Sequence, residues 1–174
     1  MSVRIFFADK EVKMKKRIIS ILILVIASVM LLSGCSATAA TRPQPEDGTE
    51  TFTITGECSA YADGDKIVVS AASDIATGTC GTLSVYSTVG VELAKTDIVQ
   101  GETNGKLETE FKIEDSWPDD VYAYLVFDTD QSKKQPDEII ALYGKQFANL
   151  VGDNVVWSSR GCAVVFQSEL VKVR

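Results

Sequence analysis

Carboxylates and thiols are the side chains of this sequence whose types could do chemistry. The 174 residues include 24 Asp and Glu, four Cys and no His. Without histidine there is no imidazole to activate a nucleophile, to ligate zinc or to act as a general base. The motifs G-x-S-x-G, the P-loop and S-x-x-K are absent. A hydrolase of this composition would need a pair of carboxylates. We expect no catalytic site, because an acidic surface accounts for the acids.

One acidic segment has the spacing of a metal-binding loop. Asp128-Thr129-Asp130-Gln131-Ser132 matches the opening of a calcium loop, D-x-D-x-S. The match then ends, since the sixth position is Lys133 instead of Gly and the twelfth is Ile139 instead of Glu. We interpret the segment as a strand-end loop with solvated acids and expect no cofactor. Calcium or small-ligand binding at Asp128 and Asp130 is the alternative.

Three cysteines, Cys58, Cys80 and Cys162, lie in the segment predicted to fold. An odd number in an exported chain leaves at least one unpaired. In an up-and-down sandwich Cys58 ends the first strand and Cys80 begins the third, so they lie roughly 25 Å apart, beyond disulfide reach. Cys162 begins a final strand at the same end as Cys80. We therefore predict a disulfide between Cys80 and Cys162, with Cys58 free. The alternative is three buried, reduced cysteines.

Aromatic side chains could supply a binding surface. Trp117 precedes Pro118 in a predicted loop, and we expect it to be exposed and to contact a partner. We expect Tyr124 and Trp157 in the core. Residues 121–127 are apolar on both faces, so either a helix covers the outer face of this strand or that face is a docking surface. We expect the helix to cover it.

The N-terminal region is organised as an export signal. Lys15-Lys16-Arg17 precedes an apolar run of 15 residues, 18–32. A spanning helix needs about 20 apolar residues, so this run suits a cleaved signal better. The run ends in Leu32-Ser33-Gly34-Cys35, which resembles the lipobox of bacterial lipoproteins. The resemblance implies that residues 1–34 are removed and that Cys35 becomes an N-terminus carrying a diacylglycerol on its sulfur.

Other interpretations of the N-terminal region stay open. An uncleaved anchor would need a longer apolar run. An ordinary secretory site, Ala37-Thr38-Ala39, is present but follows Cys35. Met14 begins a compact signal, which suggests that translation starts there.

Charge limits the partners of the exported part. Removal of residues 1–34 takes away six cations and two anions, which leaves 11 basic and 22 acidic residues and a net charge of −11. Such a chain repels nucleic acid and anionic lipid. Membrane attachment must then come from the lipid on Cys35, at the outer face of the cytoplasmic membrane. Residues 36–50 have no apolar period and predict a flexible linker, which leaves 51–174 as one domain.

Short alternating segments joined by turn residues make up this domain. They predict strands over 51–55, 66–70, 83–87, 92–99, 106–113, 121–127 and 162–173. Asp63-Gly64 predicts a turn, and Asn104-Gly105 predicts a hairpin between its flanking strands. The spacing favours an all-β, antiparallel β-sandwich. One short helix is predicted over 136–143, because Pro136 stands near its start, acids follow, and Gly144 ends it.

A set of loop and turn motifs recurs along residues 51–155. They are Ser70-Ala71-Ala72-Ser73-Asp74, Asn104-Gly105-Lys106-Leu107, Trp117-Pro118-Asp119-Asp120-Val121-Tyr122, Gln135-Pro136, and Gly144 followed by Asn149-Leu150-Val151-Gly152. In these motifs the chain resembles an immunoglobulin-like module of Gram-positive-type lipoproteins of unknown function. It departs from the family at Asp74-Ile75-Ala76, where Asn-Leu-Pro is usual. The resemblance implies an immunoglobulin-like fold and an envelope location, and it implies no reaction.

These features together predict a non-catalytic lipoprotein. We expect a module tethered to the cell surface that binds a protein or glycan of the cell envelope. A lipoprotein that binds calcium or a small ligand is the first alternative, and a hydrolase that uses only carboxylates is the second.

Overall fold

A computed structural model describes residues 41–101, 105–129 and 134–174. Residues 40–174 form one compact unit. The export signal, the lipobox with Cys35, Asn104 and Asp130 lie outside the described residues. Among the residues described, no helix is long and apolar enough to cross a membrane.

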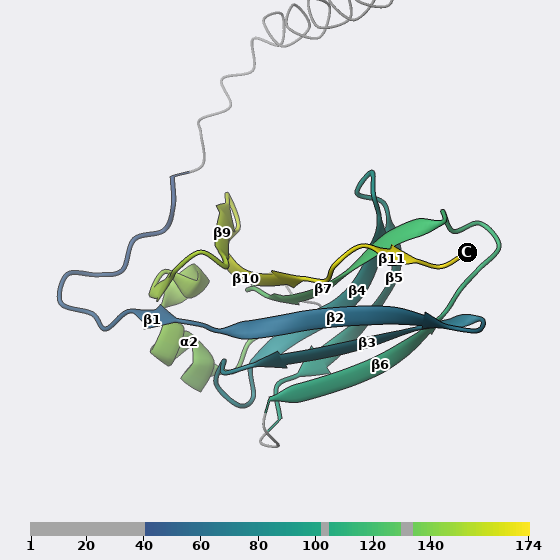
Figure 1. Cartoon of the computed structure of the whole chain (residues 1–174). Coiled ribbons are helices and arrows are strands. Elements are labelled where there is room, and N and C mark those ends of the chain that lie inside the picture. The colour runs from purple at the N-terminus through teal and green to yellow at the C-terminus, as the bar shows by residue number, and fades with distance from the viewer. Residues whose placement is uncertain (1–40, 102–104, 130–133) are drawn as a thin grey trace, which may run out of the picture. The chain divides into compact units, whose positions relative to one another are not determined.

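The larger of the sheets has six antiparallel strands (Figure 1). Their order across the sheet is β5 (Glu92–Val99), β4 (Cys80–Ser87), β7 (Asp120–Phe127), β10 (Gly161–Gln167) and β9 (Val155–Ser158), and β11 (Val171–Lys172) also pairs with β7. The central strand β7 alternates strictly between half-buried and buried side chains. One face of this sheet therefore packs inward and the other faces outward.

A second sheet covers the inner face of the first. It consists of β2 (Gly56–Asp63), β3 (Lys66–Ser73) and β6 (Lys106–Lys112), all antiparallel. Asp63 pairs with Lys66, so the predicted turn at Asp63-Gly64 closes a two-residue hairpin, with Gly64 at φ +62°. A short parallel pair, β1 (Phe52–Thr53) with β8 (Leu150–Val151), lies at one end.

The core lies between the two sheets. Its most deeply buried side chains come from both, namely Ile67, Val69, Leu83, Val85, Val121, Leu125, Phe127 and Val164, all at 0 % exposure. The β-branched and aliphatic side chains meet there because each strand alternates its faces. The all-β antiparallel sandwich predicted from the sequence is confirmed.

The predicted short helix is also confirmed. Helix α2 spans Asp137–Tyr143, begins after Pro136, and ends at Gly144. A 3-10 turn, η1 (Lys145–Phe147), follows it. Tyr143 and Phe147 are buried, and their rings lie 5.7 Å apart. The helix thus closes one end of the sandwich.

One sequence expectation about organisation is wrong. Residues 92–99 and 106–112 do not form a hairpin, because β5 pairs with β4 while β6 pairs with β3 in the other sheet. The chain crosses between the sheets there. The compact unit includes residues before Thr51, and Arg42 Nη2 donates a hydrogen bond to the Leu150 carbonyl at 2.8 Å. Arg42, within the segment expected to be a linker, therefore contacts the folded unit.

Candidate functional site

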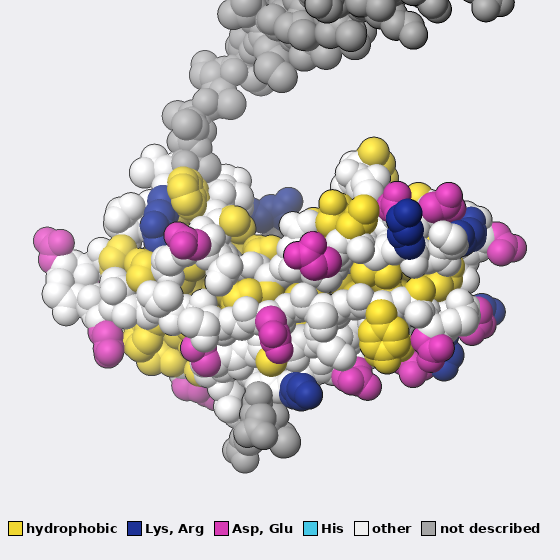
Figure 2. All heavy atoms as spheres, in the orientation of Figure 1, with side chains coloured by type: hydrophobic (Ala, Val, Ile, Leu, Met, Phe, Trp, Pro, Cys, Tyr) yellow, Lys and Arg dark blue, Asp and Glu magenta, His cyan; other side chains and the backbone are white. Residues whose placement is uncertain are grey.

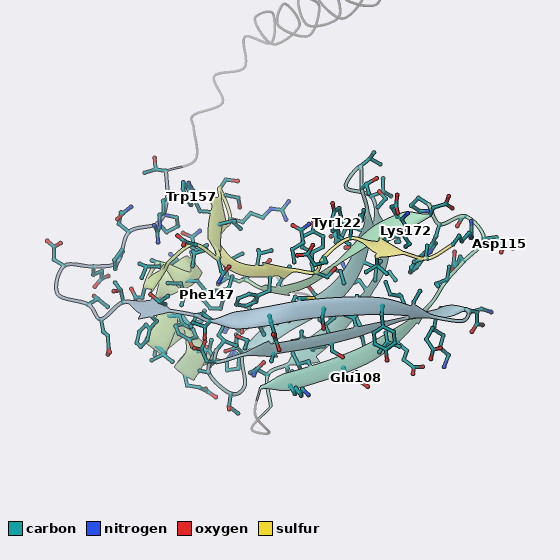
Figure 3. The ribbon with its side chains drawn as sticks, viewed as in Figure 1. Glu108, Asp115, Tyr122, Phe147, Trp157 and Lys172 are labelled. Carbon is teal, nitrogen blue, oxygen red and sulfur yellow. The ribbon has the colours of Figure 1, made fainter. Side chains whose placement is uncertain are left out.

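The outer face of the six-stranded sheet carries a cluster of tyrosines. Tyr86 on β4 lies opposite Tyr122 on β7, and Tyr124 is its diagonal neighbour. The ring centroids of Tyr86 and Tyr124 are 5.5 Å apart and those of Tyr122 and Tyr124 are 6.5 Å apart. All three rings are half-buried. Figure 3 places Tyr122 on the side of the molecule away from Glu108, which lies on β6.

Valines extend this cluster toward β10. Val126 follows Tyr124 on the same face of β7, and Val165 on β10 is its registered partner. Both are half-buried. We call these five residues, Tyr86, Tyr122, Tyr124, Val126 and Val165, the tyrosine face. It combines large amphipathic rings with apolar side chains, which is the composition of binding surfaces.

Two phenol groups of the tyrosine face, those of Tyr86 and Tyr124, have raised pKa values. The Tyr86 hydroxyl donates a hydrogen bond to Glu92 Oε2 at 2.9 Å. Partial burial, the hydrogen bond to Glu92 and the charge of that carboxylate raise the pKa of Tyr86. Partial burial and the neighbouring Tyr122 raise the pKa of Tyr124. The hydroxyl groups of Tyr86 and Tyr124 are therefore neutral.

Helix α2 does not cover the tyrosine face, contrary to the sequence expectation. Its buried side chains, Ile139 and Tyr143, pack at the end of the sandwich, where the Tyr143 ring lies 5.4 Å from that of Phe52. The hydroxyl of Tyr143 accepts a hydrogen bond from the Ala76 N–H at 2.8 Å. The helix is held to the loop before β4, so the outer face of β7 is left half-exposed. Tyr124, expected in the core, lies on this outer face instead.

The predicted binding residue Trp117 is buried, so that prediction is wrong. It is 4 % exposed and belongs to the core. The C-terminal residues cover its loop, because Arg174 donates hydrogen bonds to the carbonyls of Trp117 at 3.2 Å and Glu114 at 2.9 Å. A loop position next to proline could not reveal this contact, which joins residues 57 positions apart.

The prediction for Trp157 is wrong in the opposite direction. Expected in the core, it is 51 % exposed on β9, at the sheet edge. The Arg42 guanidinium lies 5.7 Å from its ring centroid, within the range of a cation–π contact. Figure 3 shows Trp157 on the projecting arm of β9.

The predicted disulfide between Cys80 and Cys162 is not formed, and all three described cysteines are free and buried. Cys80 lies on β4 and Cys162 on β10, with β7 between them. Two strand spacings amount to about 10 Å, which exceeds disulfide reach. The two side chains also point to opposite faces of the sheet. Cys162 shares the inner face with Val164. Gly81 abuts Phe127 on the inner face, so its neighbour Cys80 points to the outer face. The alternative of three reduced cysteines matches the structure.

Burial makes the thiols of Cys58 and Cys162 poor nucleophiles. Burial raises the pKa of Cys58 from 9.0 to about 11, against a smaller lowering by the Leu125 backbone. The pKa of Cys162 is also raised by burial, although Arg42 opposes the shift. Thiolate is the reactive form, so neither thiol is suited to covalent catalysis.

The candidate metal residue Asp128 follows the end of β7. Its carbonyl accepts a hydrogen bond from Gln135 Nε2 at 2.6 Å. Asp128 lines a cavity of about 330 Å³ together with Arg160 and Cys162. A guanidinium in the same cavity opposes a bound cation. Among residues 41–101, 105–129 and 134–174, no three His, Cys, Asp or Glu side chains are grouped to hold a metal.

A larger cavity, about 560 Å³, lies at the loops before β2 and after β3. Asp74 lines it, and both of its carboxylate oxygens accept hydrogen bonds from Thr55, at 2.8 Å from N–H and 2.7 Å from the hydroxyl. Gln100 also lines it and donates to the Ser73 carbonyl at 3.1 Å, but its buried Oε1 has no partner. The Asp74 carboxylate therefore holds the loop after β3 to the residues before β2.

Comparisons with protein-family models, with curated proteins and with solved structures gave no match for this chain.

Proposed function

We propose that this chain is an exported lipoprotein, anchored through Cys35, whose β-sandwich is a non-catalytic binding module of the cell envelope. The tyrosine face is the binding surface, and its half-exposed rings on an uncovered sheet face are the observation that carries the proposal. The anchor rests on the lipobox sequence and the apolar run before it. The immunoglobulin-like assignment belongs to the same proposal and is supported by the antiparallel sandwich.

The geometry of the rings favours a protein partner over a glycan. Tyr86 and Tyr124 stand at 86° to each other. Such an edge-to-face pair offers ring edges and hydroxyls, whereas a sugar stacks on a flat, open ring. Tyrosine supplies contact area at low conformational cost and recurs at protein interfaces.

Site-specific photocross-linking in cells tests this function. A benzophenone amino acid replaces Tyr122 in the full chain, and a matched variant carries it in place of Tyr61, which is exposed on β2 of the other sheet. We expect a cross-linked protein adduct from position 122 and none from position 61. Equal adducts from both positions, or none from position 122 in lipidated protein, would contradict the proposal.

A glycan partner is tested by sedimentation of the purified full chain with peptidoglycan. If the wild-type chain sediments with peptidoglycan and Tyr124→Ser does not, the partner is a glycan and not a protein. Incorporation of a labelled fatty acid into the wild-type chain, lost in Cys35→Ser, tests the anchor separately.

Calcium binding remains the alternative from the sequence, although the Arg160 guanidinium in the cavity of Asp128 disfavours it. Calorimetric titration with millimolar calcium decides between calcium binding and the proposed binding module. Binding heat that is seen for the wild type and is absent in Asp128→Asn would favour calcium.

A further inference from the structure

The arm formed by β9 exposes apolar side chains on both of its faces. Val156 is 50 % exposed and Trp157 is 51 % exposed. Consecutive residues of a strand point to opposite faces, and β9 is an edge strand that pairs with β10 alone. About half of each side chain is therefore open to solvent. Figure 1 shows β9 standing away from the rest of its sheet.

Arg42 fixes the start of the described chain against this arm. Its guanidinium lies over the Trp157 ring at 5.7 Å and donates to the Leu150 carbonyl at 2.8 Å. The point at which the chain leaves the folded unit is thus beside Trp157. A lipid anchor on the residues before Arg42 is therefore connected to the folded unit beside Trp157.

The length of chain before Arg42 keeps this place close to the anchor. Seven residue steps separate Cys35 from Arg42, and even fully extended they span at most about 25 Å. A globular unit of about 135 residues has a diameter of roughly 35–40 Å by the usual size scaling. The β9 arm is therefore held nearer to the anchored lipid than the far end of the sandwich can be.

Basic residues gather around the same arm. Arg160 lies in the turn between β9 and β10, and Lys145 in η1 is close to it, since Gly161 abuts Gln146. Of these cations, Arg42 contacts the Trp157 ring itself, and Asp128 lines the same cavity as Arg160. Asp153 is an exposed acid in the turn before β9. In Figure 2, a hydrophobic side chain has both a basic and an acidic side chain beside it where Figure 3 labels Trp157.

We infer that the β9 arm is a membrane-contact element, in which Trp157 and Val156 enter the interfacial region of the bilayer and Arg42, Lys145 and Arg160 meet its phosphate groups. Tryptophan prefers this interface because its ring is apolar and its N–H needs a polar partner. Arginine and lysine are attracted to anionic lipid at short range. The inference rests on the proposed lipid anchor at Cys35, which supplies the bilayer at short range.

Tryptophan fluorescence of the full chain in vesicles tests the contact. The chain has two tryptophans, Trp117 and Trp157, and Trp117 is buried. The lipidated chain is reconstituted into phosphatidylethanolamine–phosphatidylglycerol vesicles whose acyl chains are brominated near the headgroup. We expect the wild type to lose about a third or more of its emission by heavy-atom quenching, and Trp157→Phe to lose none.

A displaced tryptophan provides the matched control. In the Trp157→Phe background, Tyr61→Trp places the ring on the opposite sheet, and we expect no quenching. The inference is overturned if mass spectrometry shows the lipid on Cys35 while Trp157 stays unquenched, or if position 61 is quenched equally. If Cys35 carries no lipid, the proposed anchor fails instead; quenching of Trp157 in vesicle-bound unlipidated chain would then preserve the contact alone.

Discussion

The side-chain amide of Gln135 forms hydrogen bonds with the main chain where β4 begins and β7 ends. Gln135 is buried and forms three hydrogen bonds with the main chain: it accepts from Cys80 N–H at 2.9 Å and donates to the carbonyls of Cys80 at 2.7 Å and Asp128 at 2.6 Å. The two groups of Cys80 are buried at the start of β4, and the Asp128 carbonyl is part-buried just after β7. Because an unpaired buried polar group costs more than its hydrogen bond contributes, this one residue ties helix α2 to the sheet.

Replacing this amide is expected to be costly. We expect Gln135→Leu to lower the free energy of unfolding by about 3 kcal/mol, since three backbone groups lose their partner. The measurement is urea denaturation followed by circular dichroism. Gln167→Leu, at an exposed position on β10, is the matched control, and we expect a change within about 0.5 kcal/mol. Similar losses in both variants would contradict this role.

The Cys58 thiol makes stability depend on alkaline pH. Its pKa is 9.0 in the unfolded chain and about 11 in the folded one. Between these values the unfolded thiol has lost its proton and the folded thiol has kept it, so the free energy of unfolding falls as pH rises. The contribution is fully present below pH 9. We expect urea midpoints of Cys58→Ala to fall less steeply from pH 9 to 11 than those of the wild type, and Ser59→Ala to follow the wild type.

At the scale of elements, Gly144 decides how α2 joins the strands that follow. It has φ +78° and ψ 165°, a conformation that essentially glycine alone adopts. A Cβ there would lie 2.9 Å from Asn149 Oδ1. The Asn149 side chain in turn donates to the Leu142 carbonyl at 3.2 Å. The sharp exit of the helix and the start of β8 are therefore coupled through two residues.

A graded glycine series tests this junction. We expect Gly144→Ala to lower the free energy of unfolding by about 2–3 kcal/mol, from backbone strain and the contact with Asn149. Gly90→Ala, at φ +82° with open space around it, should cost about 1 kcal/mol. Gly101→Ala, with open space and no positive φ, should be nearly neutral. Any other order in thermal denaturation would contradict the argument.

At the scale of the whole molecule, the sandwich is held by one core without a cross-link among the described cysteines. Residues of both sheets meet in this core, together with α2, η1 and the C-terminal Val171 and Val173. The three described cysteines contribute buried volume to the fold and no disulfide. The stability of the fold should then be independent of the redox state of the medium.

Reductant provides the corresponding test. We expect the melting temperature of the purified chain to be unchanged by dithiothreitol. Thiol titration of the denatured, non-reduced chain should find three thiols, since Cys35 is proposed to carry a thioether. A lower melting temperature under reduction, or a single reactive thiol, would indicate a disulfide.

Local patterns in the sequence predicted β3 to β7, β10, the turn at Asp63-Gly64 and the helix between Pro136 and Gly144, but they did not predict β2 or β9. Each predicted element depends on neighbours within a few residues, so alternation, turn residues and helix ends suffice to predict it. Only the tertiary structure decided which strands pair and which faces are covered. It separated β5 from β6, put β7 between Cys80 and Cys162, buried Trp117 under Arg174 and left Trp157 exposed on an edge strand. These outcomes depend on contacts between residues far apart in the chain, which no local pattern specifies.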